Sequence, residues 1–249
     1  MDIPRDALSH SELAFEQYAL LYWPLHYESI NRNDMHSNSG EINTLLRAFL
    51  LKSRGKKNKY ERWFALASER CSTLQSGSLL RGKLRALRSN PLSPIFAACL
   101  FGLDDLINKF GRDPVELNRF NSAGQSALCL AIESDKLETV RAVLSSRFPA
   151  DVNLFNEHAV QQFEDWNPDK LPDTILYASA LQCAAARGSV DIARLLIDHG
   201  AHIDLVAGYF GSPLQAAALL GKIEMVQLLL MKGAEPNSQG GFHGTYCMY

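Results

Sequence analysis

The chain has 249 residues, of which 47% are hydrophobic and 21% are charged. That composition supplies enough apolar side chains for one large or two small packed domains, and it is unlike that of disordered or membrane-embedded chains. The five cysteines are odd in number and well separated, so neither a disulfide framework nor a zinc site is expected. The polar, acid-bearing N-terminus lacks the pattern of a secretory signal, so we expect a cytoplasmic or nuclear protein.

The formal net charge of −2 conceals an uneven distribution of charge along the chain. Residues 1–92 hold 14 basic and 9 acidic side chains, a balance of +5, whereas residues 93–249 hold 11 and 18, a balance of −7. The sign changes where the sequence pattern also changes. A domain boundary is therefore predicted between residues 1–90 and 91–249.

Residues 1–90 are predicted to be helical. Ser9 and Glu12 have capping-box spacing, and Pro24 ends the helix that they begin. Apolar residues at helical spacing predict two further helices, at Ile42, Leu45, Leu46, Phe49 and Leu50 and at Tyr60, Trp63, Phe64, Ala67 and Cys71. These amphipathic helices need a partner for their apolar faces, and the region after residue 90 is the nearest candidate.

A basic run from Arg47 to Arg62 lies between the second and third predicted helices. Such a run can contact nucleic acid or an acidic surface. We favour a solvated loop instead, because the run is short and the whole chain is slightly acidic. For the same reasons nucleic acid is not expected as a partner. No membrane partner is expected either, since no apolar run approaches the roughly 18–20 residues of a membrane span.

From Ser93 onward the sequence repeats at a fixed interval. Hydroxyl residues mark the start of each unit, at Ser93, Ser126, Ser179, Ser212 and Thr245. Three intervals are 33 residues and one is 53, which is a unit plus 20 inserted residues. An alanine stands five positions after each of the first four starts, and the ninth position holds Gly102, Asp135, Gly188 or Gly221. Serine suits the cap of a first helix and glycine its end.

A second helix follows in each of the best-kept units. Its apolar stripe reads Ile192, Leu195 and Leu196 in one unit and Met225, Leu228 and Leu229 in the next. Both helices end at a glycine, Gly200 or Gly233. Because no single unit can bury its own apolar faces, neighbouring units must stack.

The 33-residue period, with units that start Ser179-Ala180-Leu181-Gln182 and Ser212-Pro213-Leu214-Gln215, resembles ankyrin repeats. The resemblance implies an all-α ankyrin-repeat solenoid of helix-turn-helix units with β-turn fingers, preceded by the small helical segment. Residues 91–249 would hold about four repeats plus a truncated fifth that stops at Tyr249. Ankyrin arrays bind other proteins through their finger tips and the concave face of their first helices.

The fingers narrow the resemblance. Residues 208–215 and 237–245 are similar to the Gly-Gly-aromatic-aromatic-Gly-Thr-Ala-Leu-Gln fingers of fungal NOD-like receptor proteins. Residues 18–27 are similar to a Tyr-Ala-x-x-Tyr-Trp-x-x-His stretch that precedes the ankyrin array in those receptors. This chain has no Gly-x-x-x-x-Gly-Lys-Ser/Thr phosphate loop, so nucleotide switching cannot be carried over.

An insertion is predicted near residues 154–178. It combines five acids with several aromatic residues, and Pro168 and Pro172 argue against one long helix. Insertions in repeat proteins lie on one face, often the binding face. The alternative, which we favour, is an elongated finger that packs its aromatic side chains on its neighbours.

The ankyrin register also predicts which residues point outward for partner binding. The candidate protein-binding residues are Phe101, Ser122, Gln125, Glu133, Arg187, Tyr209, Phe210, Leu219, Leu220, Phe242 and His243. Leu100, Ser134 and Ala186 share the outward register. Exposed leucines and finger aromatics beside Arg187 would form an apolar patch. Downstream repeats or the insertion could equally cover it.

No motif for chemistry accompanies the repeats. There is no Gly-x-Ser-x-Gly elbow. The paired acids Asp104 and Asp105 suit a helix start, and His199 and His202 suit a helix end. The chain is therefore not expected to be an enzyme or to use a cofactor, a metal or a small-molecule substrate.

Two functions follow from the sequence. The first is a protein-protein interaction scaffold that binds another protein through ankyrin fingers and the concave helix face. The alternative is a linker and sensor fragment of a fungal NOD-like receptor signalling ATPase that lacks its nucleotide-binding domain.

Overall fold

The structure is a computed structural model. Residues Met1–Pro94 and Ile95–Tyr249 form two compact units, and the fold below is that of the second unit. The described residues are 64–65, 67, 94–104, 107, 117–121, 124–164 and 176–241. The helices predicted for residues 1–90 lie outside these residues, except that Phe64 and Ala67 are helical and buried.

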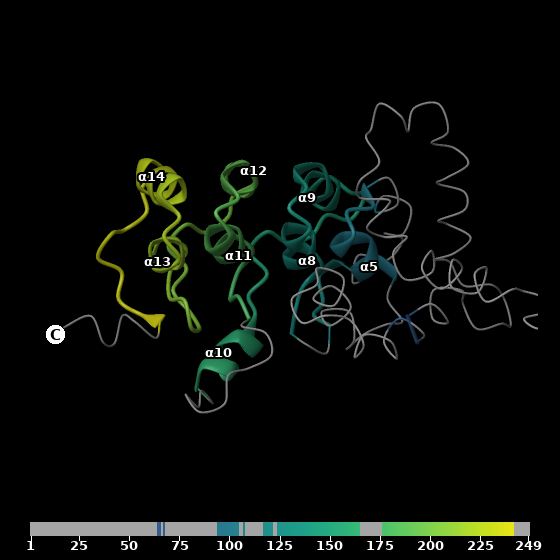
Figure 1. The fold of residues 1–249 in the computed structure, drawn as a ribbon, viewed down its shortest axis with the longest axis horizontal. Helices are drawn as coiled ribbons and strands as arrows, with labels where there is room; N and C mark the ends of the chain where they lie inside the picture. The colour runs from purple at the N-terminus through teal and green to yellow at the C-terminus, as the bar shows by residue number, and fades with distance from the viewer. Residues whose placement is uncertain are drawn as a thin grey trace, which may run out of the picture. The chain divides into compact units, whose positions relative to one another are not determined.

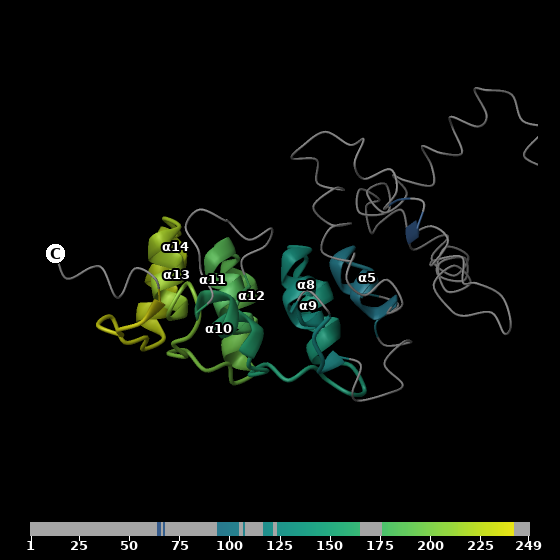
Figure 2. The ribbon, with the colours of Figure 1, turned by 90° about the horizontal axis from the view of Figure 1, so that it is seen from below.

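The second unit is built from helical hairpins. After α5 (Pro94–Leu100), the hairpins are α8 (Ala127–Glu133) with α9 (Leu137–Leu144), α11 (Ala180–Arg187) with α12 (Val190–Asp198), and α13 (Pro213–Leu219) with α14 (Ile223–Met231). The first helices contact one another in chain order, and so do the second helices (Figures 1 and 2). The described residues contain no β-strand, only two isolated bridges.

A serine starts the first helix of each hairpin, as the repeat pattern predicts. The hydroxyls of Ser126, Ser179 and Ser212 accept hydrogen bonds from the backbone N–H three residues later, at 3.1 to 3.2 Å. Ser212 forms a full capping box, because Gln215 also bonds back to its N–H. A missing cap costs about 1 kcal/mol, so these serines fix where each helix begins.

A left-handed residue follows each first helix. Gly102, Gly188 and Gly221 have φ values of 67°, 77° and 66°, and Asp135 has φ 58° at the same register position. Among the described residues, Asp135 is the one residue other than glycine that has a positive φ. Its short acidic side chain tolerates this conformation, and its carboxylate accepts a hydrogen bond from Ser189 Oγ at 2.6 Å.

Small residues make the close contacts between neighbouring hairpins. Ala184 and Ala185 of α11, like Ala217 of α13, are fully buried. Larger side chains, such as Leu196 of α12 and Leu229 of α14, fill the interior of each hairpin. The alternation of small and large residues lets helices approach closely without leaving cavities.

The segments between hairpins form paired fingers. Bridges join Phe120 to Ser126 and Ala207 to Gly211, and they close the two fingers at their bases. Gln182 ties successive fingers together: its Oε1 accepts from Ala178 N–H at 2.7 Å, and its Nε2 donates to Gly211 O at 2.6 Å. The predicted β-turn fingers are therefore present.

A ladder of polar contacts joins each hairpin connection to the next. Asn118 Oδ1 accepts from Asp151 N–H at 2.7 Å, Asn153 Oδ1 from His202 N–H at 2.8 Å, and Asp204 Oδ1 from Glu235 N–H at 2.9 Å. Each rung satisfies a backbone donor that would otherwise lack a protein partner.

The insertion contains one described helix, α10 (Glu157–Glu164), and it packs on its neighbours. Ala159, Leu176 and Ala178 form a small buried cluster, against which Leu205 and Ala207 of the following finger pack. Aromatic rings of the insertion pack on its neighbours as well, because His158 meets Phe120 edge to face at 6.0 Å and Tyr177 stacks on Phe210, whereas Phe155 is 39% exposed. The aromatic residue Trp166 lies outside the described residues.

Candidate protein-binding surface

The exposed side chains of the first helices gather at their C-terminal ends. In α11, Ala180 to Ala186 are buried and only the final residue, Arg187, is exposed. In the next hairpin, Leu219 and Leu220 at the end of α13 are 41% and 45% exposed. In the preceding hairpin, Glu133 at the end of α8 is half-buried. A charged and apolar strip therefore runs along the ends of three neighbouring helices.

Aromatic rings from two successive fingers lie side by side. The rings of Tyr177 and Phe210 are stacked, with centroids 5.4 Å apart and an angle of 15° between their planes. Tyr209 meets Phe210 edge to face at 5.3 Å. Phe210 is buried in this contact, whereas both tyrosines remain half-buried. Such pairs contribute about 0.5–1.5 kcal/mol beyond area burial, so the stack stabilises the packing of one finger on the next.

Charges surround the Tyr177 hydroxyl. Burial raises the pKa of Tyr177 well above its usual value, and the negative charge of Glu133 adds to that shift. Arg187 acts in the opposite direction and lowers the pKa of Tyr177. Glu133 also accepts a hydrogen bond from Gln125 Nε2 at 3.0 Å. The finger tyrosine is therefore electrostatically linked to an acid on α8 and a base on α11.

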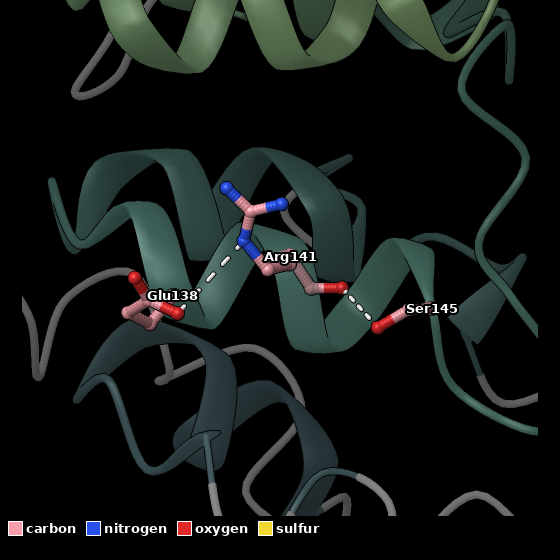
Figure 3. Close-up of polar contacts among 3 residues, drawn as sticks. All are labelled: Glu138, Arg141 and Ser145. Carbon is pink, nitrogen blue, oxygen red and sulfur yellow. Dashed lines mark hydrogen bonds and ion pairs between the residues drawn. The ribbon is translucent and has the colours of Figure 1, made fainter.

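Two basic residues of the second helices lie close to carboxylates, whereas Arg187 at the end of a first helix does not within the described part of the chain. On the outer helix α9, Arg141 lies 3.9 Å from Glu138, and its carbonyl accepts a hydrogen bond from Ser145 (Figure 3). Lys232 lies 3.7 Å from Asp198. For Arg187, no ion pair is found among the described residues. An exposed guanidinium without an internal carboxylate can pair with an acid of another molecule.

The turn after Arg187 brings a second cation close. A β-carbon at Gly188 would lie 2.8 Å from Cδ of Lys222, so the aliphatic stem of this lysine crosses the turn. The equivalent contact recurs one repeat earlier in the register, where Ser189 bonds to Asp135. The stem of a second basic residue, Lys222, therefore lies against the turn that follows Arg187.

Three predicted binding residues are buried, contrary to expectation. Phe101 is fully buried, although its register equivalent Arg187 is exposed. Burying a phenylalanine side chain stabilises the fold by about 1.5–3 kcal/mol, whereas a charged arginine is more stable in water. Phe210 is covered by the two tyrosines, and Gln125 turns inward to Glu133. Leu100 and Ala186, predicted to point outward, are also buried.

The other predicted residues divide into two groups. Glu133, Arg187, Tyr209, Leu219 and Leu220 keep partial or full exposure. Ser122, Phe242 and His243 lie outside the described residues.

Tyr177 belongs to this surface, and sequence reasoning missed it. The residue stands two positions before the capping Ser179, just as Phe210 stands two positions before Ser212. This shared register was the available signal. It was hidden because Tyr177 closes the insertion and was counted as part of it.

The cysteine side chains in the described part of the chain are buried. Cys99, Cys129 and Cys183 are free and buried. Burial raises the pKa of the Cys99 and Cys183 thiols well above the usual range, which disfavours the reactive thiolate, whereas a hydrogen bond with Cys183 lowers the pKa of Cys129. Among the described residues, no group of three or more His, Cys, Asp or Glu side chains could hold a metal ion. None of the described helices is long and apolar enough to cross a membrane.

Comparison with known families agrees with this architecture. Residues 155–240 match the family model for ankyrin repeats (3 copies). The described residues of the second unit have an all-α ankyrin fold. The ankyrin match begins inside the predicted insertion and includes α11 to α14, and the hairpin of α8 and α9 before it has the same serine cap. No curated protein matches the chain. Ankyrin repeats generally mediate protein–protein interaction, which agrees with protein binding as the class of function predicted from the sequence.

Proposed function

We propose that the chain is a protein-binding scaffold that captures its partner on the strip formed by Arg187, Leu219 and Leu220. The proposal is carried by the exposed guanidinium of Arg187, for which no ion pair is found in the described part of the chain. Buried alanines hold its helix in place, and two exposed leucines follow in the next repeat. Arginine is enriched at interface hot spots, and the two exposed leucines add apolar area beside it.

The free thiols are consistent with a reducing compartment for this scaffold. Cys99, Cys129 and Cys183 are unpaired, as is common in the reducing cytoplasm or nucleus. We place the scaffold there, with another protein as partner and with no catalytic or cofactor role.

The test compares an arginine on the proposed binding strip with an arginine on the outer helix α12, away from the strip. Tagged full-length chain is used for affinity purification from the cells that express it, with bound proteins quantified by mass spectrometry. Arg187→Ala should reduce capture of the specific partner about tenfold or more, because a central arginine of an interface contributes on the order of 2 kcal/mol. The matched control is Arg194→Ala, which removes an exposed arginine from the outer helix α12.

The control must retain capture, and both variants must melt at the wild-type temperature. Equal capture by Arg187→Ala and by wild type would remove this strip from consideration. Phe210→Ala is unsuitable as a binding variant, because Phe210 is buried in the ring stack and its loss would disturb the fold.

A second candidate function rests on the resemblance of residues 18–27 and 208–215 to fungal NOD-like receptors. In this case the chain would be the linker and sensor part of a signalling ATPase. Its work would be to hold or release a nucleotide-binding domain. A phosphate loop encoded upstream in the same reading frame would support it, and a stop codon there would reject it.

A further inference from the structure

The strip on the first helices changes in chemical character along the stack. Glu133, Ala186 and Leu219 occupy one register position in three successive hairpins, and Ser134, Arg187 and Leu220 occupy the next. The side chains at these positions therefore run from the half-buried acid Glu133 on α8, through exposed Arg187 on α11, to the exposed leucines at the end of α13. A partner that lies along the stack meets these groups in that order.

The basic position is suited to a carboxylate. Arg187 directly precedes the turn at Gly188, which the Lys222 stem crosses, and the arginine offers a planar pair of N–H donors. Arginine–carboxylate pairs can form two parallel hydrogen bonds, and such charge-assisted bonds are about twice as strong as neutral ones. Glu133 lies one repeat away and disfavours a partner with many negative charges, such as nucleic acid.

The apolar position is suited to one large aliphatic side chain. Leu219 and Leu220 are adjacent, and each leaves more than two fifths of its surface exposed. The Leu220 N–H donates to Ala216 O, which holds the pair against the end of α13. Two neighbouring leucines present a patch that a leucine, isoleucine or methionine of a partner can cover.

The spacing of the two positions sets the spacing in the partner. α11 and α13 pack against each other, and packed helices lie about 8–10 Å apart. An extended backbone advances about 3.3 Å per residue, so this distance corresponds to roughly three residues. We infer that the strip binds an extended segment of a partner protein that carries Asp or Glu and, three positions away, a large aliphatic residue. This inference rests on the proposed function and specifies its partner.

The experiment uses full-length chain and fluorescein-labelled 12-residue peptides of Gly, Ser and Ala that carry one Asp and one Leu. The probes place these two residues one to six positions apart, and fluorescence polarisation measures binding. The peptide with a three-residue step should bind most tightly. Replacing its Asp by Lys, or its Leu by Ser, should weaken binding about tenfold, and added salt should weaken only the Asp-dependent part.

Protein variants identify the contacts. Arg187→Glu should reverse the preference, so that the Lys peptide binds better than the Asp peptide. Leu220→Ser should weaken both leucine peptides equally, and Lys222→Ala should weaken the Asp peptide by a smaller factor. The matched controls are Arg194→Glu on α12 and Met231→Ser on α14, which change exposed residues away from the strip. Both controls should bind as wild type does, and circular dichroism should show every variant folded.

Three outcomes overturn the inference. They are equal binding of Asp and Lys peptides, tighter binding of a labelled single-stranded oligonucleotide, and no binding of any peptide. If one of them occurs while capture of the cellular partner still depends on Arg187, the partner chemistry is wrong and the scaffold function stands. If that capture is also independent of Arg187, both proposals are wrong.

Discussion

The interior hairpin α11/α12 and the last described hairpin α13/α14 share one sequence pattern but differ in burial. Ala185 of α11 is fully buried, whereas its equivalent Ala218 of α13 is exposed. Val190 of α12 is half-buried, whereas its equivalent Ile223 of α14 is 71% exposed. Each hairpin covers the face of the one before it, so burial depends on the neighbouring repeat more than on the residue type.

The turns of the two hairpins show the same difference. A β-carbon at Gly188 would meet the Lys222 side chain, whereas a β-carbon at the equivalent Gly221 would find no atom within 4 Å. Substitutions at equivalent positions should therefore have unequal effects wherever the next repeat makes the contact, and equal effects wherever the backbone alone sets the energy.

The largest difference is expected for a buried charge. Ala185→Glu would place a carboxylate between α11 and its neighbours without a partner, at a cost of several kcal/mol, and should prevent stable folding. Ala218→Glu introduces the same residue at an exposed equivalent and should change the free energy of unfolding by less than about 0.5 kcal/mol. Urea denaturation followed by circular dichroism measures both. Similar losses in the two variants would show that Ala218 is also covered.

The next largest difference concerns the glutamines that tie fingers together. Gln182→Ala removes bonds to Ala178 N–H and to two carbonyls, Ala207 O and Gly211 O, and should cost about 2–4 kcal/mol. Gln215→Ala removes bonds to Ser212 N–H and Ser238 O from a half-buried site and should cost about 1–2 kcal/mol. The same denaturation measurement ranks them, and a reversed order would contradict the assigned burial.

Local signals predicted much of this fold. Ser179 and Ser212 cap their helices, and the positions of Gly188 and Gly221 are left-handed, as the period indicated. These features depend on residues within one turn of each other, so the sequence displays them directly. The same holds for Asp135, which adopts the left-handed conformation that its register requires.

Burial at the candidate surface was harder to predict. The register indicated an outward position for Phe210, yet Tyr177 from the preceding finger covers its ring. Phe101 likewise occupies an outward register and is fully buried. A repeat pattern gives the direction of a side chain from its own helix or finger, but not the side chains that approach from other repeats or from an insertion.

A smaller effect is expected at the two left-handed glycines. Gly188→Ala and Gly221→Ala each force alanine to a φ near 70°, which costs about 1 kcal/mol. The loss for Gly188 should be larger by about 0.5 kcal/mol, because the Lys222 side chain, whose Cδ would lie 2.8 Å from the new β-carbon, must rotate away from the turn. Thermal unfolding of the two variants tests this. A much larger loss at Gly188 would mean that the Lys222 stem is fixed in the turn.

The smallest effect is expected where the two hairpins share a surface ion pair. Lys232, at the end of α14, lies 3.7 Å from Asp198 of α12, with side-chain exposures of 38% and 66%. Exposed pairs contribute about 0.2–1 kcal/mol, and Lys232 also faces the negative end of its own helix. Lys232→Ala should therefore cost less than about 1 kcal/mol, and the pairwise part should disappear at high salt. A double-mutant cycle with Asp198→Ala separates that part from the helix-end effect, since a coupling that persists in 1 M salt would require a pair shielded from solvent.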